Sequence, residues 1–513
     1  MRAGRPLVWL ALVLSALAAA GARAQDDAID VGRRIFLEGR NASGEPIRAL
    51  FGQQSTPIAG AAVACGNCHG ADGRGRPEGG VVPPDITWED LTKPYGHVRA
   101  AGRRHGPYDE RSFARAITES IDPAGQRIDG AMPRFSLSVS EIEALTQYLK
   151  RLSQLHDPGV ADSALVLGTI LPDRGPAVEV GTAMRAMLHA YIGDINERGG
   201  VHGRRVELEV VPDFETAAER FTRRPVFALV SPYGVGREPE LARFAQERRL
   251  DVIAPFTLSV GREPSLQTFY LYAGVADLAR VLLDYAGRQG DLKAQRLAAF
   301  VDEPDAGVAD ALQAECKRRR CAGLEVLPAR SAAEPGAVAR LAHSSVGAVI
   351  FAGSDRELAA LIGMADRLGW RPAIYAPGAA AARAMFAAPA AFKDLLYVAF
   401  PTRGDLQSGS PAAQAFEKLR QGRGLDASHA AAQGFAYAAM SITLEALRRA
   451  GRDVSRERFA HAVEGLYRFD AGPTPPVSYG PGRRVGALGG YVVAVDPQRG
   501  FRPVSDWIGL EPL

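Results

Sequence analysis

With 513 residues, the chain is too long for one ordinary domain, and its length alone suggests roughly two to four. Hydrophobic residues make up 47% of the sequence and charged residues 23%, a composition that excludes a largely disordered protein. The net charge of +3 comes from three arginines within residues 1–24, and the remainder is formally neutral. This balance argues against nucleic acid or anionic lipid as the main partner.

The first 24 residues have the pattern of an export signal. Arg2 and Arg5 provide positive charge, residues 7–20 are apolar, and residues 22–24 offer small side chains at a cleavage site. We predict a signal peptide over residues 1–24, removed on export to the periplasm; an uncleaved membrane anchor is the alternative. No later run of about 18 apolar residues follows, so we expect no membrane span in the mature chain.

A Cys-x-x-Cys-His sequence follows, formed by Cys65, Cys68 and His69. This is the attachment pattern of a c-type haem: two thiols add to the two vinyl groups of the porphyrin, and the adjacent His supplies an axial nitrogen to the iron. A redox-active dithiol does not need the His, and a zinc site needs two further close ligands, which do not follow. We predict one covalent haem c with His69 as an iron ligand.

Met132 is the predicted second iron ligand. It is the only Met between His69 and the end of this segment, and Pro133 favours an extended backbone at this position. The alternatives are a Met that only fills the core, and ligation by His97 or His105, whose Arg and Gly neighbours instead indicate a polar loop. A thioether ligand raises the reduction potential and closes the iron to substrates, which suits electron transfer.

Three helical stretches accompany these residues, at 30–39, 108–120 and 138–152. With the Cys-x-x-Cys-His sequence near the front, the Pro-Pro-Asp-Ile sequence at 83–86 and the Met132-Pro133 loop, residues 27–155 resemble class I c-type cytochromes. The resemblance implies a small all-α cytochrome c domain that binds haem through Cys65, Cys68, His69 and Met132. Residues 41–61, with scattered Gly, Ser and Pro, depart from the compact family pattern.

The pattern changes after a predicted linker at residues 156–162. Strand-like and helix-like stretches then alternate, with strands expected at 164–170, 206–211, 227–230, 250–255, 296–301 and 347–351, and a helix at 176–197. Such alternation predicts parallel sheets covered by helices on both faces. Because roughly 350 residues exceed one sheet domain, we expect two α/β lobes over residues 163–513.

Residues 194–208 read Asp-Ile-Asn-Glu-Arg-Gly-Gly-Val-His-Gly-Arg-Arg-Val-Glu-Leu, in which Gly199 and Gly200 are expected to end a helix. This stretch closely resembles type I periplasmic binding proteins of the branched-chain amino acid receptor class, and a weaker resemblance covers residues 163–510. The resemblance implies two lobes joined by crossing strands and a small-molecule solute held in the cleft between them. It also implies hinge closure on binding and an ABC permease as a partner.

In α/β sheets the ligand lies beyond the carboxyl ends of the strands, so the loops there are candidates. The candidate ligand-binding residues are Tyr233, Gly234, Phe256, Thr257, Asp305, Ser354 and Asp355. Amino acid receptors usually place small hydroxyl residues on the first two loops, whereas here bulky Tyr233 follows Ser231 and Thr257 follows Phe256. A cleft lined by these two rings would suit a small, partly apolar ligand: an alcohol, an aldehyde or an aromatic acid. Each loop residue could instead be turn scaffold.

Cys316 and Cys321 lie around the end of a helix expected at 308–319. In the oxidising compartment reached after export, we expect them to form a structural disulfide that contributes roughly 2 kcal/mol for so short a loop. Two unpaired thiols held apart by the helix are the alternative.

No nucleophile–base arrangement, metalloprotease motif, P-loop or dinucleotide fingerprint occurs in its proper context, so we predict that the chain is not an enzyme. Three functions remain open. The chain could be an electron carrier whose large domain binds a solute or docks a periplasmic redox partner, a dehydrogenase or an oxidase. It could be a receptor for an ABC importer with an accessory haem domain, or a haem-linked ligand sensor. The predicted His/Met ligation favours the first.

Overall fold

The computed structural model describes residues 27–52, 54–75, 83–98, 102–152, 157–260, 267–289, 296–302, 307–344, 346–378, 382–402, 409–496 and 500–512. The chain divides into two compact units, Met1–His156 and Asp157–Leu513. The predicted signal peptide lies outside the described residues. Residues 157–162 of the predicted linker belong to the second unit, where Gly159 O accepts a hydrogen bond from Val166 N at 2.7 Å.

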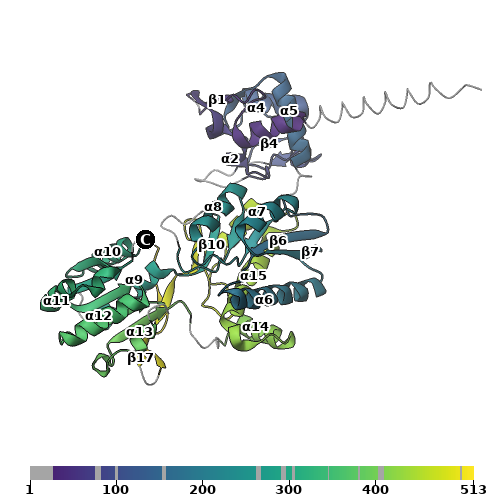
Figure 1. The fold of residues 1–513 in the computed structure, drawn as a ribbon. Helices are drawn as coiled ribbons and strands as arrows, with labels where there is room; N and C mark the ends of the chain where they lie inside the picture. The colour runs from purple at the N-terminus through teal and green to yellow at the C-terminus, as the bar shows by residue number, and fades with distance from the viewer. Residues whose placement is uncertain are drawn as a thin grey trace, which may run out of the picture. The chain divides into compact units, whose positions relative to one another are not determined.

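The N-terminal unit is mainly helical (Figure 1). Residues 27–38 form its first helix, followed by α2 (Cys65–His69), α3 (Trp88–Leu91), α4 (Glu110–Glu119) and α5 (Val139–Leu152). It also contains strands, which an all-α domain would lack. Residues 41–61 supply β1 (Arg48–Phe51) and β2 (Thr56–Ala59), and these form an antiparallel sheet with β5 (Arg134–Ser136) in the order β2-β1-β5. A separate pair joins β3 (His97–Val98) to β4 (Arg104–His105).

The first helix of this unit crosses α5 at a glycine. A Cβ on Gly32 would collide with the carbonyl oxygen of Ala144, so a larger residue would force the two helices apart. Four residues further along, the ring of Phe36 meets that of Tyr148, with centroids 5.4 Å apart. Both rings are buried, and they belong to the single hydrophobic core cluster found among the described residues of this unit.

The C-terminal unit contains two sheets, each forming one lobe (Figure 1). In the first lobe the strand order is β16-β10-β9-β8-β6-β7, and the paired strands run parallel. The strands are β6 (Ala164–Ile170), β7 (Arg205–Val211), β8 (Ala228–Val230), β9 (Asp251–Ile253), β10 (Thr268–Tyr272) and β16 (Val485–Ala487). The helices are α6 (Val178–Glu197), α7 (Phe214–Arg223), α8 (Glu238–Arg248), α14 (Pro411–Gly422), α15 (Ala430–Ala450) and α16 (Arg456–Glu464).

The second lobe has the strand order β12-β11-β13-β14-β15-β17-β18, with β19 paired to β17. Its strands are β11 (Arg296–Val301), β12 (Leu324–Pro328), β13 (Val346–Ala352), β14 (Ala373–Pro377), β15 (Leu396–Phe400), β17 (Gly489–Asp496), β18 (Gly500–Pro503) and β19 (Ile508–Gly509). Its helices are α9 (Val275–Gln289), α10 (Val308–Arg319), α11 (Pro335–His343), α12 (Asp355–Arg367) and α13 (Ala382–Phe386). β11 to β15 pair in parallel and β17 to β19 antiparallel, which makes this sheet mixed.

The chain passes between the two sheets three times, from β10 to α9, from β15 to α14 and from β16 to β17. Each sheet is covered on both faces by separate hydrophobic clusters. In the first lobe α6 and α15 pack on one face and α7 and α8 on the other. The prediction of two α/β lobes with helix-covered sheets is confirmed.

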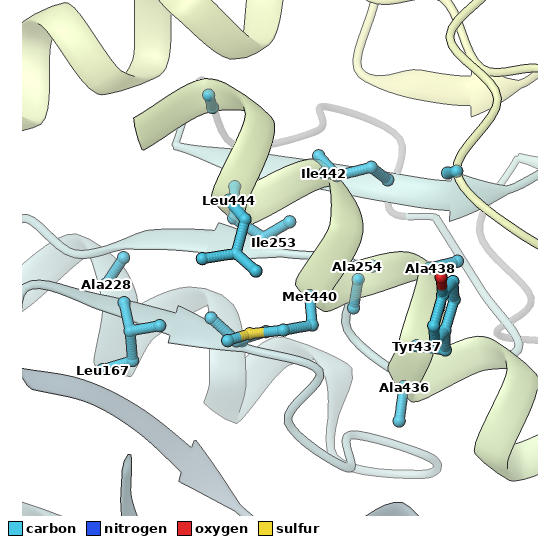
Figure 2. Packing of buried hydrophobic residues seen from close by; sticks show 14 of the residues in the cluster. Leu167, Ala228, Ile253, Ala254, Ala436, Tyr437, Ala438, Met440, Ile442 and Leu444 are labelled. Carbon is cyan, nitrogen blue, oxygen red and sulfur yellow. The ribbon is translucent and has the colours of Figure 1, made fainter. Parts of the chain in front are cut away.

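Helix α15 forms the centre of the first lobe's core (Figure 2). The side chain of Met440 lies between this helix and Leu167 of β6, and Leu444 lies near Ile253 of β9. All four side chains are at most 1% exposed. Burying side chains of this size stabilises the fold by about 1.5–3 kcal/mol each, so this helix holds the sheet that carries the first two candidate loops.

Glycines end helix α6 where the sequence predicts. Gly199 and Gly200 follow the helix with φ of +94° and +75°, in the left-handed region that favours glycine. The N–H of Gly200 donates to Ile195 O at 2.9 Å, and a Cβ on Gly200 would collide with the carbonyl oxygen of Arg204. The predicted glycine stop is confirmed, and it turns the chain into β7.

Candidate functional site

The Cys-x-x-Cys-His sequence forms the short helix α2 in the N-terminal unit. His69 closes this helix, is only 4% exposed, and its ring Nδ1 lies 2.9 Å from the carbonyl oxygen of Pro84. A Cβ on Gly75 would collide with the carbonyl oxygen of Pro83, so the glycine lets the segment with Pro84 approach the motif. The fold therefore fixes the imidazole plane by a backbone acceptor distant in sequence.

This arrangement fits an iron-ligating histidine. When Nδ1 carries the proton and donates to Pro84 O, the lone pair of His69 is on Nε2, the atom that binds a metal. Metal-binding histidines in proteins usually donate their other ring N–H to a carbonyl or carboxylate in this way. His69, Cys65 and Cys68 are thus the residues that would hold a covalent haem.

The two motif cysteines differ in their surroundings. Cys68 is exposed, whereas Cys65 packs against the core of the unit. Burial raises the pKa of the Cys65 thiol to about 12. Catalytic dithiols instead need one cysteine with a lowered pKa. Cys65 is therefore not the cysteine of lowered pKa that a catalytic dithiol needs.

Met132 packs against the same hydrophobic core as Cys65. Its loop is ordered by Asp129, whose Oδ1 accepts a hydrogen bond from Ala131 N at 2.9 Å and whose carbonyl oxygen accepts one from Met132 N at 3.0 Å. The side chain is partly buried. Its ligation to iron stays a prediction.

The alternative ligands His97 and His105 do not lie in a polar loop, contrary to the sequence-based expectation. They are register partners of β3 and β4, with ring centroids 5.1 Å apart, and His105 is only 6% exposed. Asp90 Oδ2 lies 3.7 Å from His97 Nδ1, and His105 Nδ1 lies 2.9 Å from Gly106 O. The two rings pack on the paired strands β3 and β4, and Tyr108 contacts the His105 ring edge-on at 5.1 Å.

The second candidate site begins with two matching loops in the first lobe, one after β8 and one after β9. Ser231 and Ala254 start these loops with φ of +50° and +47°, and each is followed by a proline. Non-glycine residues in this region cost about 1–3 kcal/mol each and are concentrated at functional sites. Two hydrogen bonds stabilise these backbone conformations: Ser231 N donates to Ile253 O at 2.8 Å, and Ala254 N donates to Phe269 O at 2.7 Å.

Tyr233 and Phe256 lie side by side on these loops. They form a parallel bridge, and their rings stack with centroids 5.7 Å apart and an angle of 17°. The neighbours Gly234 and Thr257 also meet, because a Cβ on Gly234 would lie 3.0 Å from Thr257 Cγ2. The structure thus brings four of the seven predicted ligand-binding residues together at the carboxyl ends of β8 and β9.

Two further aromatic residues join this pair, and sequence reasoning missed both. Phe435 of α15 packs edge-on against Phe256 at 4.9 Å and against Tyr272 at 5.5 Å. Tyr272 ends β10, the next strand of the sheet. We call Tyr233, Phe256, Tyr272 and Phe435 the aromatic cluster. Of the two further residues, only Tyr272 could have been found from the sequence, because it lies at the carboxyl end of a strand, where ligands bind in α/β sheets.

The remaining predicted residues belong to the second lobe, where they have structural partners. Ser354 caps α12 and its Oγ donates to Glu357 Oε2 at 2.7 Å. Asp355 Oδ1 accepts a hydrogen bond from Ala384 N at 2.7 Å, which fixes α13. Asp305 lies outside the described residues. The binding role of these three residues stays a prediction.

Cys316 and Cys321 are free thiols in this structure, so it does not contain the predicted disulfide. They are nevertheless not held apart by α10. Cys321 N donates to Cys316 O at 3.0 Å, and both side chains pack in the same cluster. Burial and the neighbouring Cys321 thiol raise the pKa of Cys316 to about 12, which keeps Cys316 protonated at neutral pH.

Comparisons with known families agree with the division of the chain into an N-terminal and a C-terminal unit. Residues 165–500 match the periplasmic binding protein family, and residues 51–153 match the cytochrome c family. The chain belongs to the periplasmic binding protein family. Its N-terminal unit is a cytochrome c domain, which implies a haem cofactor, and its C-terminal unit is a type I periplasmic binding domain. No curated protein matches the chain.

Solved structures resemble the periplasmic binding domain. A fatty acid ABC transporter substrate-binding protein from Thermomonospora curvata is 21% identical, with a TM-score of 0.50 over 70% of this chain and 95% of that chain. A leucine-binding protein from Thermotoga maritima is 18% identical, with a TM-score of 0.50 over 67% and 98%. At these identities the likeness shows the fold alone. In the described part of the chain, no helix combines the length and apolar character needed to cross a membrane.

Proposed function

We propose that the chain is a periplasmic electron carrier in which one covalent haem c is combined with a solute-binding domain. The observation that carries this proposal is the buried His69, oriented by Pro84 O on the Cys-x-x-Cys-His helix of a cytochrome c domain. Electron transfer is then linked to the binding of a small ligand or to docking of a periplasmic dehydrogenase or oxidase. The chain carries out no substrate chemistry of its own.

The residues of the cytochrome c domain have separate roles in this proposal. Cys65 and Cys68 would hold the haem through thioether bonds, and His69 and Met132 would each supply a ligand to its iron. A bound haem provides an iron that gains and loses one electron. The Pro84 carbonyl keeps the imidazole in the tautomer that ligates through Nε2. Two protein ligands would leave the iron no open position for a substrate, which suits outer-sphere electron transfer.

A receptor for an ABC importer, with the haem domain as an accessory, is the second candidate. It is favoured by the match of residues 165–500 to the periplasmic binding protein family. This part of the chain folds into two lobes, and the chain passes between them three times. The solved neighbours are named for a fatty acid and for leucine, so their names point to no single solute class. The proposed export and periplasmic location serve both candidate functions.

A measurement of redox potential with and without solute tests the coupling. If solute binding and the haem are linked, the solute shifts the midpoint potential, and its affinities for the ferric and ferrous forms differ by the same free energy. A shifted potential supports ligand-linked electron transfer or sensing. If a solute binds with equal affinity to both forms, coupling is absent and the importer-receptor function is favoured. A protein without a c-type α-band in its reduced spectrum would contradict the haem proposal itself.

A further inference from the structure

The aromatic cluster at the first lobe's loops is the feature that defines a solute class. Its four rings come from three strand ends and one helix, and neighbouring rings contact each other edge-on or stacked. Tyr233, Phe256 and Tyr272 are partly buried, whereas Phe435 is only 7% exposed. Ring faces and edges attract another flat ring through offset or edge-on contacts, each worth about 0.5–1.5 kcal/mol beyond area burial.

The same loops offer few donors for a carboxylate. The prolines at 232 and 255 have no N–H, and five other backbone N–H groups already donate within the protein. These belong to Ser231, Tyr233, Gly234, Ala254 and Phe256, with donor–acceptor distances of 2.7–3.0 Å. A carboxylate bound here without such donors would lose its hydration without replacement, which is costly.

A hydroxyl side chain at position 234 is disfavoured by packing. A Cβ there would lie 3.0 Å from Thr257 Cγ2 and 3.1 Å from Leu241 Cδ2, so even serine would crowd both groups. The first loop therefore presents Gly234 beside Tyr233, where a small hydroxyl residue would otherwise help to hold an amino acid head group. Ser231 Oγ is fully buried and has no hydrogen-bond partner among the described residues, which leaves one neutral polar group at the base of this loop.

The arginine next to these loops is already paired. Arg237 forms two hydrogen bonds with the carboxylate of Glu240, both 2.7 Å long. Glu238 Oε1 accepts from Leu258 N at 3.4 Å, which ties α8 to the second loop. In the second lobe, the polar atoms of Ser354 and Asp355 hold helix ends. Arg237 is therefore not available as a partner for a ligand carboxylate.

We propose that the solute of this domain is an uncharged aromatic alcohol or aldehyde, held by ring contacts in the aromatic cluster. The proposal rests on the proposed solute-binding function and specifies its substrate class. A neutral oxygen substituent needs only a hydroxyl or a water as partner. The carboxylate of an α-amino acid needs a cation or free N–H donors, and Arg237 and the five N–H groups named above are already engaged.

Calorimetry on the full haem-containing protein tests the proposal, with benzyl alcohol, benzaldehyde, benzoate, phenylalanine and leucine as probes. We expect benzyl alcohol or benzaldehyde to bind at least ten-fold more tightly than the three charged probes. Phe256→Leu keeps the apolar volume but removes the ring, and we expect about ten-fold weaker binding of the aromatic probe. Tyr233→Phe, which keeps the ring, should bind within about three-fold of the parent protein.

Tyr95→Ala in the cytochrome c domain is the matched control, since it removes an aromatic side chain that is 81% exposed. It should leave affinity unchanged. Tightest binding of leucine, phenylalanine or benzoate would overturn the proposed class while leaving solute binding intact. Failure of every probe and of a wider set of amino acids and fatty acids to bind would overturn both this inference and the solute-binding function.

Discussion

The ring Nδ1 of His69 lies 2.9 Å from the carbonyl oxygen of Pro84. This contact joins the motif helix to a segment that follows it, and it fixes which ring nitrogen can ligate iron. The segment is itself held by Asp85, whose Oδ1 accepts hydrogen bonds from Thr87 N at 2.8 Å and Thr87 Oγ1 at 2.7 Å. The orientation of the imidazole therefore depends on a short polar turn outside the motif.

We expect Asp85→Ala to raise the midpoint potential of the haem. Loss of the turn loosens the Pro84 carbonyl, the imidazole becomes a weaker electron donor, and the ferric state is stabilised less. Potentiometric titration measures the shift. Asp109→Ala is the matched control, because Asp109 also uses its carboxylate in a local cap, accepting from Ser112 N at 2.7 Å at the start of α4. Equal shifts in both variants would show that only the lost charge matters.

Met132→Ala is expected to remove the methionine-to-iron charge-transfer band from the ferric spectrum and to lower the potential, because thioether ligation raises it. Near-infrared absorption and redox titration measure both effects. Met364→Ala on α12 serves as the control, since Met364 is also partly buried but belongs to the other unit. A parent protein without the band, or a variant that keeps it, would show that Met132 is not the ligand.

A buried network of ion pairs around Glu315 in the second lobe is expected to stabilise the fold. Glu315 is fully buried on α10, and its carboxylate contacts Arg280 at 3.3 Å and both Arg318 and Arg319 at 2.6 Å. Burial alone would raise the pKa of Glu315, but the hydrogen bonds from Arg318 and Arg319 and the charge of Arg280 bring it below its ordinary value. The carboxylate is thus stabilised in the folded state.

Glu315→Leu should lower the free energy of unfolding by at most about 3–5 kcal/mol, because the buried Arg280 loses one of its two carboxylate partners and keeps only Asp277 at 2.9 Å. In the parent protein, this contribution is present above the unfolded pKa of glutamate and is lost as pH falls through the lower folded pKa. Urea unfolding at pH 7 and at acid pH measures both effects. Glu219→Leu, which removes an exposed ion pair with Arg223, should cost less than about 1 kcal/mol. Similar losses in both variants would contradict the assignment.

The features that could be predicted from the sequence depend on residues close together in the chain. The predicted roles of Cys65, Cys68 and His69 rest on their spacing within five residues, and the end of α6 follows from two adjacent glycines. The aromatic cluster could not be derived in this way, because Phe435 reaches Phe256 only through the packing of α15 on the sheet.

Other features had a signal that sequence reasoning did not use. Ser354 and Glu357 have the Ser-x-x-Glu spacing of a capping box. This spacing is typical of a helix N-terminus and is weaker evidence for a ligand site. By contrast, β1 and β2 are short strands with little regular alternation of burial, so residues 41–61 carried no clear periodic signal.

Asp251 makes the unfolding of the periplasmic binding domain depend on pH. It begins β9, at the end of the strand opposite the candidate loop, and is 6% exposed. Burial raises its pKa to about 7, against the opposing charges of Arg456 and Arg484. A carboxyl with a raised folded pKa contributes stability below its unfolded pKa, and this contribution is lost as pH rises through the folded value.

We therefore expect the Asp251→Asn variant to lose less stability than the parent protein between about pH 4 and pH 7. A shift of three pKa units corresponds to roughly 4 kcal/mol, which is an upper bound for the difference. Chemical unfolding at pH 4 and pH 8 measures it. The exposed Asp173→Asn is the control and should follow the parent. Parallel stability curves for all three proteins would contradict a raised pKa.

The Cys316 and Cys321 thiols are predicted to join when the chain is exported to an oxidising compartment. Their backbones are already linked by the hydrogen bond from Cys321 N to Cys316 O at 3.0 Å, so the residues are close before oxidation. Mass spectrometry of the non-reduced protein should show the bridge. Its reduction should lower the free energy of unfolding by roughly 2 kcal/mol, the loop-entropy value for so short a loop.

The Cys316→Ser, Cys321→Ser double variant separates the bridge from other effects of reductant, because its stability should not respond to reduction. Cys65 and Cys68, the proposed haem attachment residues, remain in this variant, so the same cytochrome spectrum is expected from both proteins. Two free thiols at these positions in periplasmic protein would overturn the disulfide. A reductant effect of equal size in the double variant would place the sensitivity elsewhere in the chain.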